Sequence, residues 1–222
     1  MVSENHFLPL LIDMSDKKIV IFGGGSVGER KALLFSPHAD VTVISRDFTP
    51  ILQEAGESGN LILVIEDANT LSDENIAEFI EGSFLVIPAT NERSINEKIV
   101  TVAKQKEILT NQVDAIGDVT VPSVIKRGDL TISISTSGSS PAFSRYTRQK
   151  VEKVITPQFA DMIRIQDAIR SYLKENVPEQ RERKDILWQI LDSKEVWSAL
   201  GESYEKGFKT AQDIVMKISE KV

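Results

Sequence analysis

An apolar run that ends in three closely spaced glycines constrains the fold of this chain more than any other feature. Residues 18–22 read Lys-Ile-Val-Ile-Phe, and Gly23, Gly25 and Gly28 follow with the spacing Gly-x-Gly-x-x-Gly. Between a strand and a helix, the first glycine permits a tight turn, the second lets the backbone approach a pyrophosphate, and the third lets helix and strand pack closely. The amphipathic residues 26–35 supply that helix, whose first N–H groups would face the anion. The context predicts a dinucleotide site; a purely structural glycine turn is the alternative, because the same spacing occurs in ordinary loops.

Strands and helices alternate over the first half of the chain, which is typical of a parallel sheet with helices on both faces. The further strands are expected at 40–44, 61–65, 84–88 and 108–110, and the further helices at 73–80 and 91–106. Residues 7–12 are apolar and are interpreted as an edge strand or a covering segment. The sequence therefore predicts an α/β fold whose N-terminal part, residues 1–113, is a Rossmann domain with a doubly wound parallel sheet.

The ends of two predicted strands supply further contacts to the dinucleotide. Asp47 lies 19 residues after Gly28, close to the roughly 20 expected for a carboxylate that accepts a hydrogen bond from the adenosine ribose. Arg46 suits a 2′-phosphate instead, so the residues favour NAD but leave NADP open; with NAD, Arg46 would point to solvent. Thr90 follows the fourth strand at the ligand-binding edge of such a sheet and is expected near the cofactor.

The pattern changes after residue 113. Residues 119–125 and 130–135 are read as two paired strands joined by a turn at 126–129, so we predict a small β region over residues 114–140.

A helical region is predicted from residue 141 to residue 222. Ser140 suits an N-cap and Pro141 the first position of a helix, whose first turn would be a second anion site. Helix breaks are expected at Pro178 and Gly201, and Trp188 and Trp197 are core candidates.

Charge is distributed unevenly along the chain. The net charge is −7, with −8 in residues 1–113 and +1 in the remainder, and residues 126–153 carry six Lys/Arg against two Asp/Glu. A polyanionic ligand would prefer that basic segment, although a solvated helix face explains it equally well. Nucleic acid is not an expected partner, because the chain is acidic and no aromatic residues interleave with the basic ones.

Several kinds of site are not expected. The chain has no Cys, its two His are isolated, and no Ser-His-Asp arrangement is present, so neither a protein-bound metal nor a familiar nucleophilic triad is predicted. No stretch reaches the roughly 18 apolar residues of a membrane span, and residues 1–9 lack the pattern of a signal peptide. We expect a cytoplasmic protein that does not bind membranes.

Four motifs, in this order and spacing, are similar to the precorrin-2 dehydrogenase family of siroheme biosynthesis. They are Gly23-Gly-Gly-Ser-Val-Gly-Glu-Arg-Lys31, Asn111-Gln-Val-Asp114, Val121-Pro-Ser123 and Ser135-Thr-Ser-Gly-x-x-Pro141-x-x-x-Arg145. The resemblance implies NAD-dependent oxidation of precorrin-2 to sirohydrochlorin. Some members also insert ferrous iron, which the sequence leaves open. It further implies a homodimer that associates through the central β region.

The resemblance assigns roles to individual residues. It implies that Ser26 and Val27 contact the NAD pyrophosphate, that Arg46 and Asp47 contact the adenosine ribose, and that Asp114 is the essential carboxylate. Thr136 falls where some members carry a serine that lines the tetrapyrrole cavity. Residues 117–121 depart from the aromatic-containing segment expected in the family.

The chemistry of the residues agrees with these roles. Asp114 follows the last predicted sheet strand, and a carboxylate there could accept the proton that leaves when a hydride is transferred; the alternative is a turn-forming Asp. Precorrin-2 is a polycarboxylate, and cationic side chains beside a helix N-terminus suit it. The predicted substrate contacts are Asn111, Thr136, Ser137, Gly138, Arg145 and Arg148.

A regulatory module that senses NAD without catalysis is the rival interpretation. It explains the glycine loop but gives no role to residues 111–114 or 135–145.

Overall fold

The computed structural model describes residues 7–113 and 115–219. Its internal contacts divide the chain into two compact units, Met1–Val121 and Pro122–Val222. In the described ranges no helix is long and apolar enough to cross a membrane.

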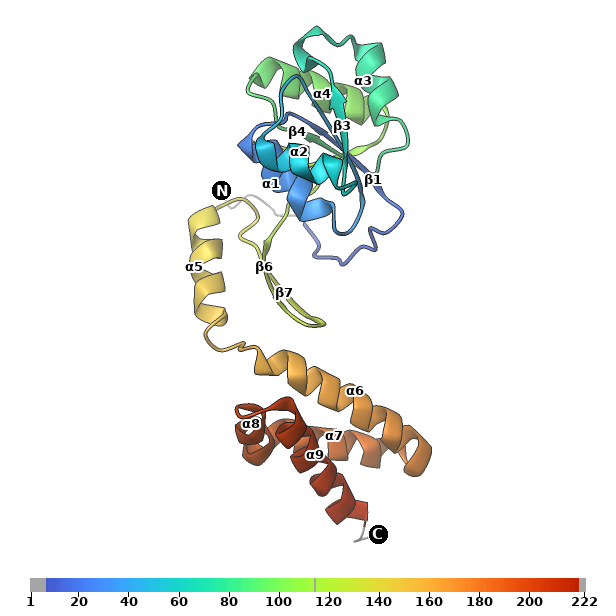
Figure 1. Ribbon diagram of the computed structural model, residues 1–222, viewed down its shortest axis with the longest axis vertical. Coiled ribbons are helices and arrows are strands. Elements are labelled where there is room, and N and C mark those ends of the chain that lie inside the picture. The colour runs from blue at the N-terminus through green and yellow to red at the C-terminus, as the bar shows by residue number, and fades with distance from the viewer. Residues whose placement is uncertain (1–6, 114, 220–222) are drawn as a thin grey trace. The chain divides into compact units, whose positions relative to one another are not determined.

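A parallel sheet of five strands forms the centre of the first unit (Figure 1). The strands lie in the spatial order β3-β2-β1-β4-β5, so the order reverses between β1 and β4. In sheets of this kind, ligands bind outside the carboxyl ends of the strands at the reversal point. The strands are β1 (Lys18–Phe22), β2 (Asp40–Ser45), β3 (Ile62–Ile65), β4 (Leu85–Pro88) and β5 (Leu109–Thr110).

Alternate side chains of the sheet enter two separate cores. Ile19 and Ile21 of β1 pack beneath the first pair of helices, whereas Val20 and Phe22 pack beneath the second pair, and all four side chains are fully buried. The first pair is α1 (Ser26–Phe35) and α2 (Pro50–Glu57), and the second is α3 (Asp73–Ile80) and α4 (Arg93–Gln105), with a short 3₁₀ helix, η1 (Ala68–Thr70), after β3. Helices therefore cover both faces, and the predicted doubly wound sheet is confirmed.

Residues 7–12 were expected to form an edge strand or a covering segment, and that expectation is wrong. They form neither a strand nor a helix, and Leu8 and Leu11 are highly exposed. Pro9 has no backbone N–H, so it could join an edge strand only where that group would face solvent.

A two-stranded antiparallel hairpin opens the second unit. β6 (Ser123–Arg127) pairs with β7 (Leu130–Ile134) across a turn that begins with Gly128, at φ 56°. A glycine with positive φ at this position is typical of a type II′ hairpin turn. The pairing is as predicted, but the first strand begins at Ser123 rather than at 119. The N–H of Val119 donates to Thr110 in the first unit, and Pro122 has no N–H to offer.

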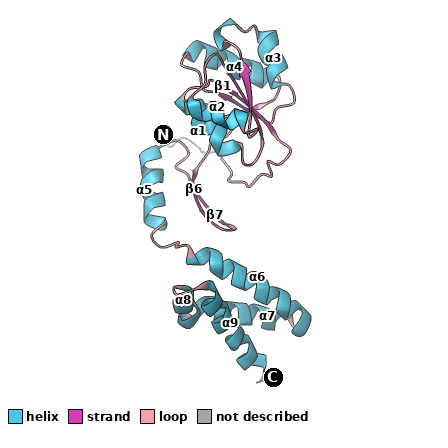
Figure 2. Cartoon of the chain, viewed as in Figure 1, coloured by secondary structure: helices cyan, strands magenta, loops and turns pink. Residues whose placement is uncertain are grey.

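Helices make up the rest of the second unit (Figure 2). They are α5 (Pro141–Val151), α6 (Gln158–Asn176), α7 (Gln180–Asp192), α8 (Lys194–Leu200) and α9 (Tyr204–Ser219). The helices α6, α7, α8 and α9 share a third core, which includes Ile165, Ile190 and Ala211. Trp197 packs against it, but Trp188 is 55% exposed, so its assignment to the core is wrong.

Candidate functional site

The glycine loop between β1 and α1 is built so that three of its glycines cannot carry a side chain. A Cβ on Gly24 would lie 2.2 Å from the carbonyl oxygen of Asp47. Gly23 has φ 118°, and a Cβ there would lie 2.3 Å from the carbonyl oxygen of Ala89. A Cβ on Gly28 would lie 1.8 Å from the carbonyl oxygen of Gly23, so α1 crosses directly over the loop. These contacts are the tight turn and the close helix packing expected from the spacing.

Gly25 differs because nothing lies within 4 Å of the position its Cβ would occupy. It is also the N-cap of α1, and no side chain caps this helix. The start of α1 therefore presents backbone N–H groups and the positive end of the helix dipole beside open space. An anion such as a pyrophosphate fits this place.

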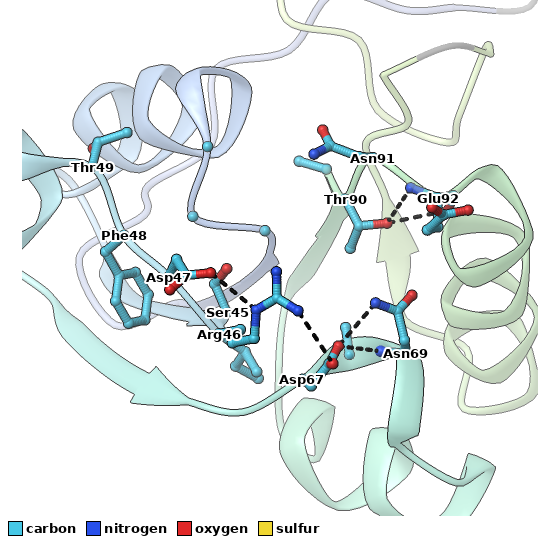
Figure 3. A pocket seen from close by; sticks show the side chains of 16 residues that line it. Ser45, Arg46, Asp47, Phe48, Thr49, Asp67, Asn69, Thr90, Asn91 and Glu92 are labelled. Atoms are coloured by element: carbon cyan, nitrogen blue, oxygen red, sulfur yellow. Dashed lines mark hydrogen bonds and ion pairs between the residues drawn. The ribbon is translucent and has the colours of Figure 1, made fainter.

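A pocket of about 560 Å³ opens at the carboxyl ends of β1, β2 and β4 (Figure 3). Five predicted cofactor residues line it: Gly23, Gly25, Arg46, Asp47 and Thr90. The other three, Ser26, Val27 and Gly28, lie in the first turn of α1 and do not line it. Eleven further residues, which were not among the predicted cofactor contacts, complete the lining: Gly24, Ile44, Ser45, Phe48, Thr49, Asp67, Ala68, Asn69, Ala89, Asn91 and Glu92.

Two carboxylates flank the guanidinium of Arg46 in this pocket (Figure 3). Arg46 Nε lies 3.0 Å from Asp47 Oδ2, and Arg46 Nη1 lies 4.0 Å from Asp67 Oδ2. The hydrogen bond to Asp47 raises the pKa of Arg46 above its ordinary value, and the charges of Asp47 and Asp67 act in the same direction. The Arg46 side chain is 73% exposed, as expected, but it is paired.

Asp67 is fixed by its own neighbours. Its carboxylate accepts hydrogen bonds from the backbone N–H and the side-chain amide of Asn69, at 3.0 and 2.9 Å. It follows β3, at the same sheet edge as Asp47. The parallel sheet could have suggested this residue, since the carboxyl ends of parallel strands share one edge.

Thr90 lines the pocket, but its polar atoms are occupied by the fold. Its hydroxyl donates to Asn96 Oδ1 at 2.8 Å, and the amide of Asn96 donates back to the carbonyl of Thr90 at 3.0 Å. The N–H of Glu92 donates to the Thr90 hydroxyl. Thr90 therefore shapes the link between β4 and α4 at the pocket wall.

Asn111 follows β5 and is only 4% exposed. Its side-chain oxygen accepts from Lys31 Nζ at 2.7 Å, and its side-chain nitrogen donates to the carbonyl of Val119 at 2.7 Å. Both groups of the amide thus have partners within the first unit. Asp114, the predicted catalytic residue, lies outside the described residues.

The remaining predicted substrate residues lie together in the second unit, on the loop before α5 and on α5 itself. Thr136 is the centre of that loop: its hydroxyl bonds with the backbone of Ser140 at 3.0 Å and with the hydroxyl of Ser144 at 3.1 Å. Ser137 and Gly138 both have positive φ, 53° and 85°. The N–H of Ser139 donates to the Thr136 carbonyl, as in a type I′ turn.

The first turn of α5 is capped as predicted, with the Ser140 hydroxyl accepting from the N–H of Phe143 at 3.2 Å. The two arginines on this helix differ. Arg148 pairs with Glu152 at 3.1 Å, and both side chains are about one-third exposed, whereas Arg145 is exposed. Arg145 is therefore the freer cation for a ligand.

No group of three His, Cys, Asp or Glu side chains within the described ranges could hold a metal ion.

Comparisons with known proteins agree with this architecture. The family model described as "Putative NAD(P)-binding" matches residues 10–123, and a model for the central part of sirohaem biosynthesis proteins matches residues 127–153. Among solved structures, the fold of this chain is similar to that of the chain described as "SirC, precorrin-2 dehydrogenase", with a TM-score of 0.74 at 17% identity. That match covers 96% of this chain and 100% of the SirC chain.

Sequence relatives give a finer assignment. A precorrin-2 dehydrogenase of Methanosarcina barkeri is 56% identical over 215 residues, which is 97% of this chain and 96% of the relative. Siroheme synthase 1 of Aeromonas hydrophila is 31% identical over 192 residues, 85% of this chain. The match spans only 40% of that synthase's length. With end-to-end similarity to one relative and matching models for both its NAD(P)-binding and its central part, this chain belongs to the precorrin-2 dehydrogenase family.

Proposed function

We propose that this protein oxidises precorrin-2 to sirohydrochlorin, with NAD⁺ as the hydride acceptor. Precorrin-2 and NAD⁺ give sirohydrochlorin, NADH and one proton, so the substrate loses a hydride and a proton. The observation that carries the proposal is the 56% identity to a precorrin-2 dehydrogenase over nearly the full length of both chains.

The pocket of the first unit suits a dinucleotide. The open backbone at Gly25 and the start of α1 would hold the pyrophosphate, because these N–H groups have no side-chain cap. Asp47 would accept from the ribose hydroxyls. A 2′-phosphate would face Asp47 and Asp67, while the guanidinium of Arg46 is already paired with both, so NAD is favoured over NADP.

The bound nicotinamide supplies the hydride acceptor, and the protein must supply a place for the proton. We assign that role to Asp114, the carboxylate at the family position. It belongs to the loop after β5, and β5 ends at the same sheet edge as the pocket. A positioned carboxylate of this kind contributes about 10²-fold or more as a general base.

The start of α5 suits the carboxylates of the tetrapyrrole. Pro141 and Ser140 open a helix whose N-terminal N–H groups favour an anion, and Arg145 extends one turn further with its guanidinium exposed. Thr136, Ser137 and Gly138 form the tight turn that precedes this helix. We assign this loop and helix to substrate binding.

We also propose that the protein is a homodimer joined through the β6–β7 hairpin. A two-stranded hairpin is marginal by itself, and no other described strand pairs with either of its edges. A second copy would complete this sheet. Sedimentation at several concentrations tests the assembly, and a monomer would contradict it. We place the enzyme in the cytoplasm, which cell fractionation would test.

The direct test of the function is to incubate the protein with precorrin-2 and NAD⁺ and to follow the visible spectrum together with NADH fluorescence. The proposal requires the sirohydrochlorin spectrum to appear with NADH. NAD⁺ binding without any change in the tetrapyrrole would point instead to a sensing module. Adding ferrous iron to the product mixture then determines whether this chain also inserts the metal.

A further inference from the structure

The loop that follows β5 is fixed where its two ends meet. The N–H of Val119 donates to the carbonyl of Thr110 at 3.0 Å, and the carboxylate of Asp118 accepts from the N–H and the hydroxyl of Thr110 at 3.0 and 2.8 Å. A Cβ on Gly117 would lie 2.6 Å from the Thr110 carbonyl oxygen, so the returning chain runs directly against β5. Asp114 belongs to this closed loop by its place in the sequence.

Asn111 joins the inner end of the loop to three other parts of the first unit. Its backbone N–H donates to Val86 of β4 at 3.0 Å, and its side-chain nitrogen donates to the carbonyl of Val119, where the loop returns. Its side-chain oxygen accepts from Lys31 of α1. Through its backbone N–H and its side-chain amide, this one buried residue connects the sheet, both ends of the loop and the helix that follows the glycines.

Lys31 determines which way this amide can point. An ammonium group only donates, and a carbonyl only accepts, so the Asn111 oxygen must face Lys31 and its nitrogen must face Val119. Without the ammonium group of Lys31, the buried amide oxygen of Asn111 would have no hydrogen-bond partner in this orientation. The orientation in which Asn111 donates to Val119 would then be less favourable. Lys31 is partly buried, and this burial lowers the pKa of its ammonium group, with a smaller contribution from Arg30.

Because Lys31 lies on α1, its hydrogen bond to Asn111 can affect catalysis. The N-terminus of α1 faces the pocket proposed to hold the pyrophosphate, and Lys31 lies six residues beyond the N-cap Gly25 on the same rigid helix. The hydrogen bond from Lys31 to Asn111 therefore ties the cofactor-binding helix to the loop that carries the proposed base. No motif match assigns this role, because the two residues are 80 positions apart.

We propose that Lys31 is a positioning residue, which acts through Asn111 to hold the loop of residues 111–119 in register with the cofactor-binding helix. This inference rests on the proposed function, with Asp114 as the base. A misplacement of about 1 Å can cost on the order of 10²-fold in rate, so loss of Lys31 should lower kcat for precorrin-2 oxidation by roughly 10- to 100-fold. NAD⁺ affinity should be retained, because Lys31 is not in the pocket lining.

The matched variants are Lys31→Met and Lys98→Met. Lys98 on α4 is also partly buried, and its Nζ donates to the carbonyl of Leu71 and lies 3.3 Å from Asp73. Both replacements remove an ammonium group that bonds a helix to a loop in the same unit, while they keep most of the apolar stem. Lys98→Met also removes the ion pair with Asp73, so it is at least as large a perturbation as Lys31→Met. Lys31→Arg restores a donor and should recover much of the rate, and it serves as the folded variant should Lys31→Met not fold.

A double-mutant cycle with Asn111→Ala tests the route of the effect. If Lys31 acts through Asn111, the double variant should lose no more kcat than the worse single variant, since coupled residues are not additive. Additive losses would overturn the proposal. So would equal kcat in Lys31→Met and the wild-type enzyme, or equal losses of kcat in the Lys31 and Lys98 variants, because these results would leave Lys31 a role in stability only.

Hydrogen exchange separates a failure of this inference from a failure of the proposed function. In the Lys31→Met variant, amides of residues 112–119 should exchange faster than in wild type, and in Lys98→Met they should not. An inactive wild-type protein would contradict the proposed function, whereas unchanged exchange in Lys31→Met would contradict the positioning role regardless of activity.

Discussion

Arg46 Nε lies 3.0 Å from the Asp47 carboxylate, at the mouth of the pocket and facing a second carboxylate, Asp67. The arginine next to the ribose position is therefore already neutralised, although both side chains of the pair are largely exposed. Such an exposed pair adds little to stability. Its significance is for the choice of cofactor: two carboxylates face one guanidinium, so a net negative charge remains to oppose a phosphate.

The cofactor prediction follows from this arrangement. The wild-type enzyme should have a higher kcat/KM with NAD⁺ than with NADP⁺, and Asp47→Asn should reduce that preference by about tenfold, which corresponds to about 1.4 kcal/mol. Asp40→Asn, at the opposite end of β2 from the pocket, is the control and should leave the preference unchanged. A tenfold preference of the wild type for NADP⁺ would be inconsistent with this account of the pocket.

The glycines provide a matched pair of variants. Gly28→Ala should destabilise the protein by about 1–3 kcal/mol, because its Cβ would meet the Gly23 carbonyl in a packed site. Gly25→Ala should lower thermal stability less than Gly28→Ala, since its Cβ would enter open space and only the N-cap preference is lost. It should weaken NAD⁺ binding by about tenfold or more, or ~1.4 kcal/mol. Thermal melting and titration calorimetry measure the two effects. Normal NAD⁺ affinity in Gly25→Ala would show that the pyrophosphate does not bind at the start of α1.

The two arginines of α5 should differ in their effect on substrate binding. Arg145→Gln should raise the KM for the tetrapyrrole and make it less sensitive to salt, because an exposed cation is lost. Arg148→Gln should have the smaller effect, since Arg148 is engaged by Glu152. Arg181→Gln, on the exposed side of α7, is the control. Equal KM values for the tetrapyrrole in all three variants would show that the α5 arginines are solvated surface residues that do not bind the substrate.

The start of α9 should show a specific dependence on pH. Hydrogen bonds from its own backbone N–H and from Ser203 lower the pKa of Glu205 below 4.5, with a smaller contribution from Arg164. A lowered folded-state pKa means that the stabilisation is present above the unfolded value and is lost as pH falls through the folded value. Glu205→Gln should therefore lower Tm at pH 7 but not in strong acid, whereas Asp213→Asn on the same helix serves as the control. A Tm difference that persists in strong acid would contradict the charge argument.

The sheet and its first helix could be predicted closely from the sequence, because local signals coincide there. Residues 18–22 and 26–35 are found as a strand and a helix with the expected bounds, and the glycine spacing fixes the turn between them. The helix α2 was missed, although Thr49 caps it and Pro50 opens it. Those two residues are a recognisable helix start signal, an N-cap followed by proline at the first helical position.

Tertiary relationships could not be predicted in the same way. Helical periodicity does not say which neighbour covers a residue, so Trp188 was assigned to the core although it is more than half exposed. The residues of the pocket come from four separate connections, and Asp67 enters it only because β3 and β2 are adjacent. The bond between Lys31 and Asn111 spans 80 positions, and no local pattern encodes it.

The proposed activity and its base are tested together by comparing the wild-type and Asp114→Asn enzymes in the oxidation of precorrin-2 by NAD⁺. Asparagine keeps the size of the side chain but cannot accept the proton at neutral pH. The wild type should form sirohydrochlorin and NADH in equal amounts, and Asp114→Asn should retain NAD⁺ binding and Tm while its rate falls by roughly 10²-fold or more. A wild type that binds NAD⁺ but leaves precorrin-2 unchanged, or a folded variant with a normal rate, would contradict this proposal.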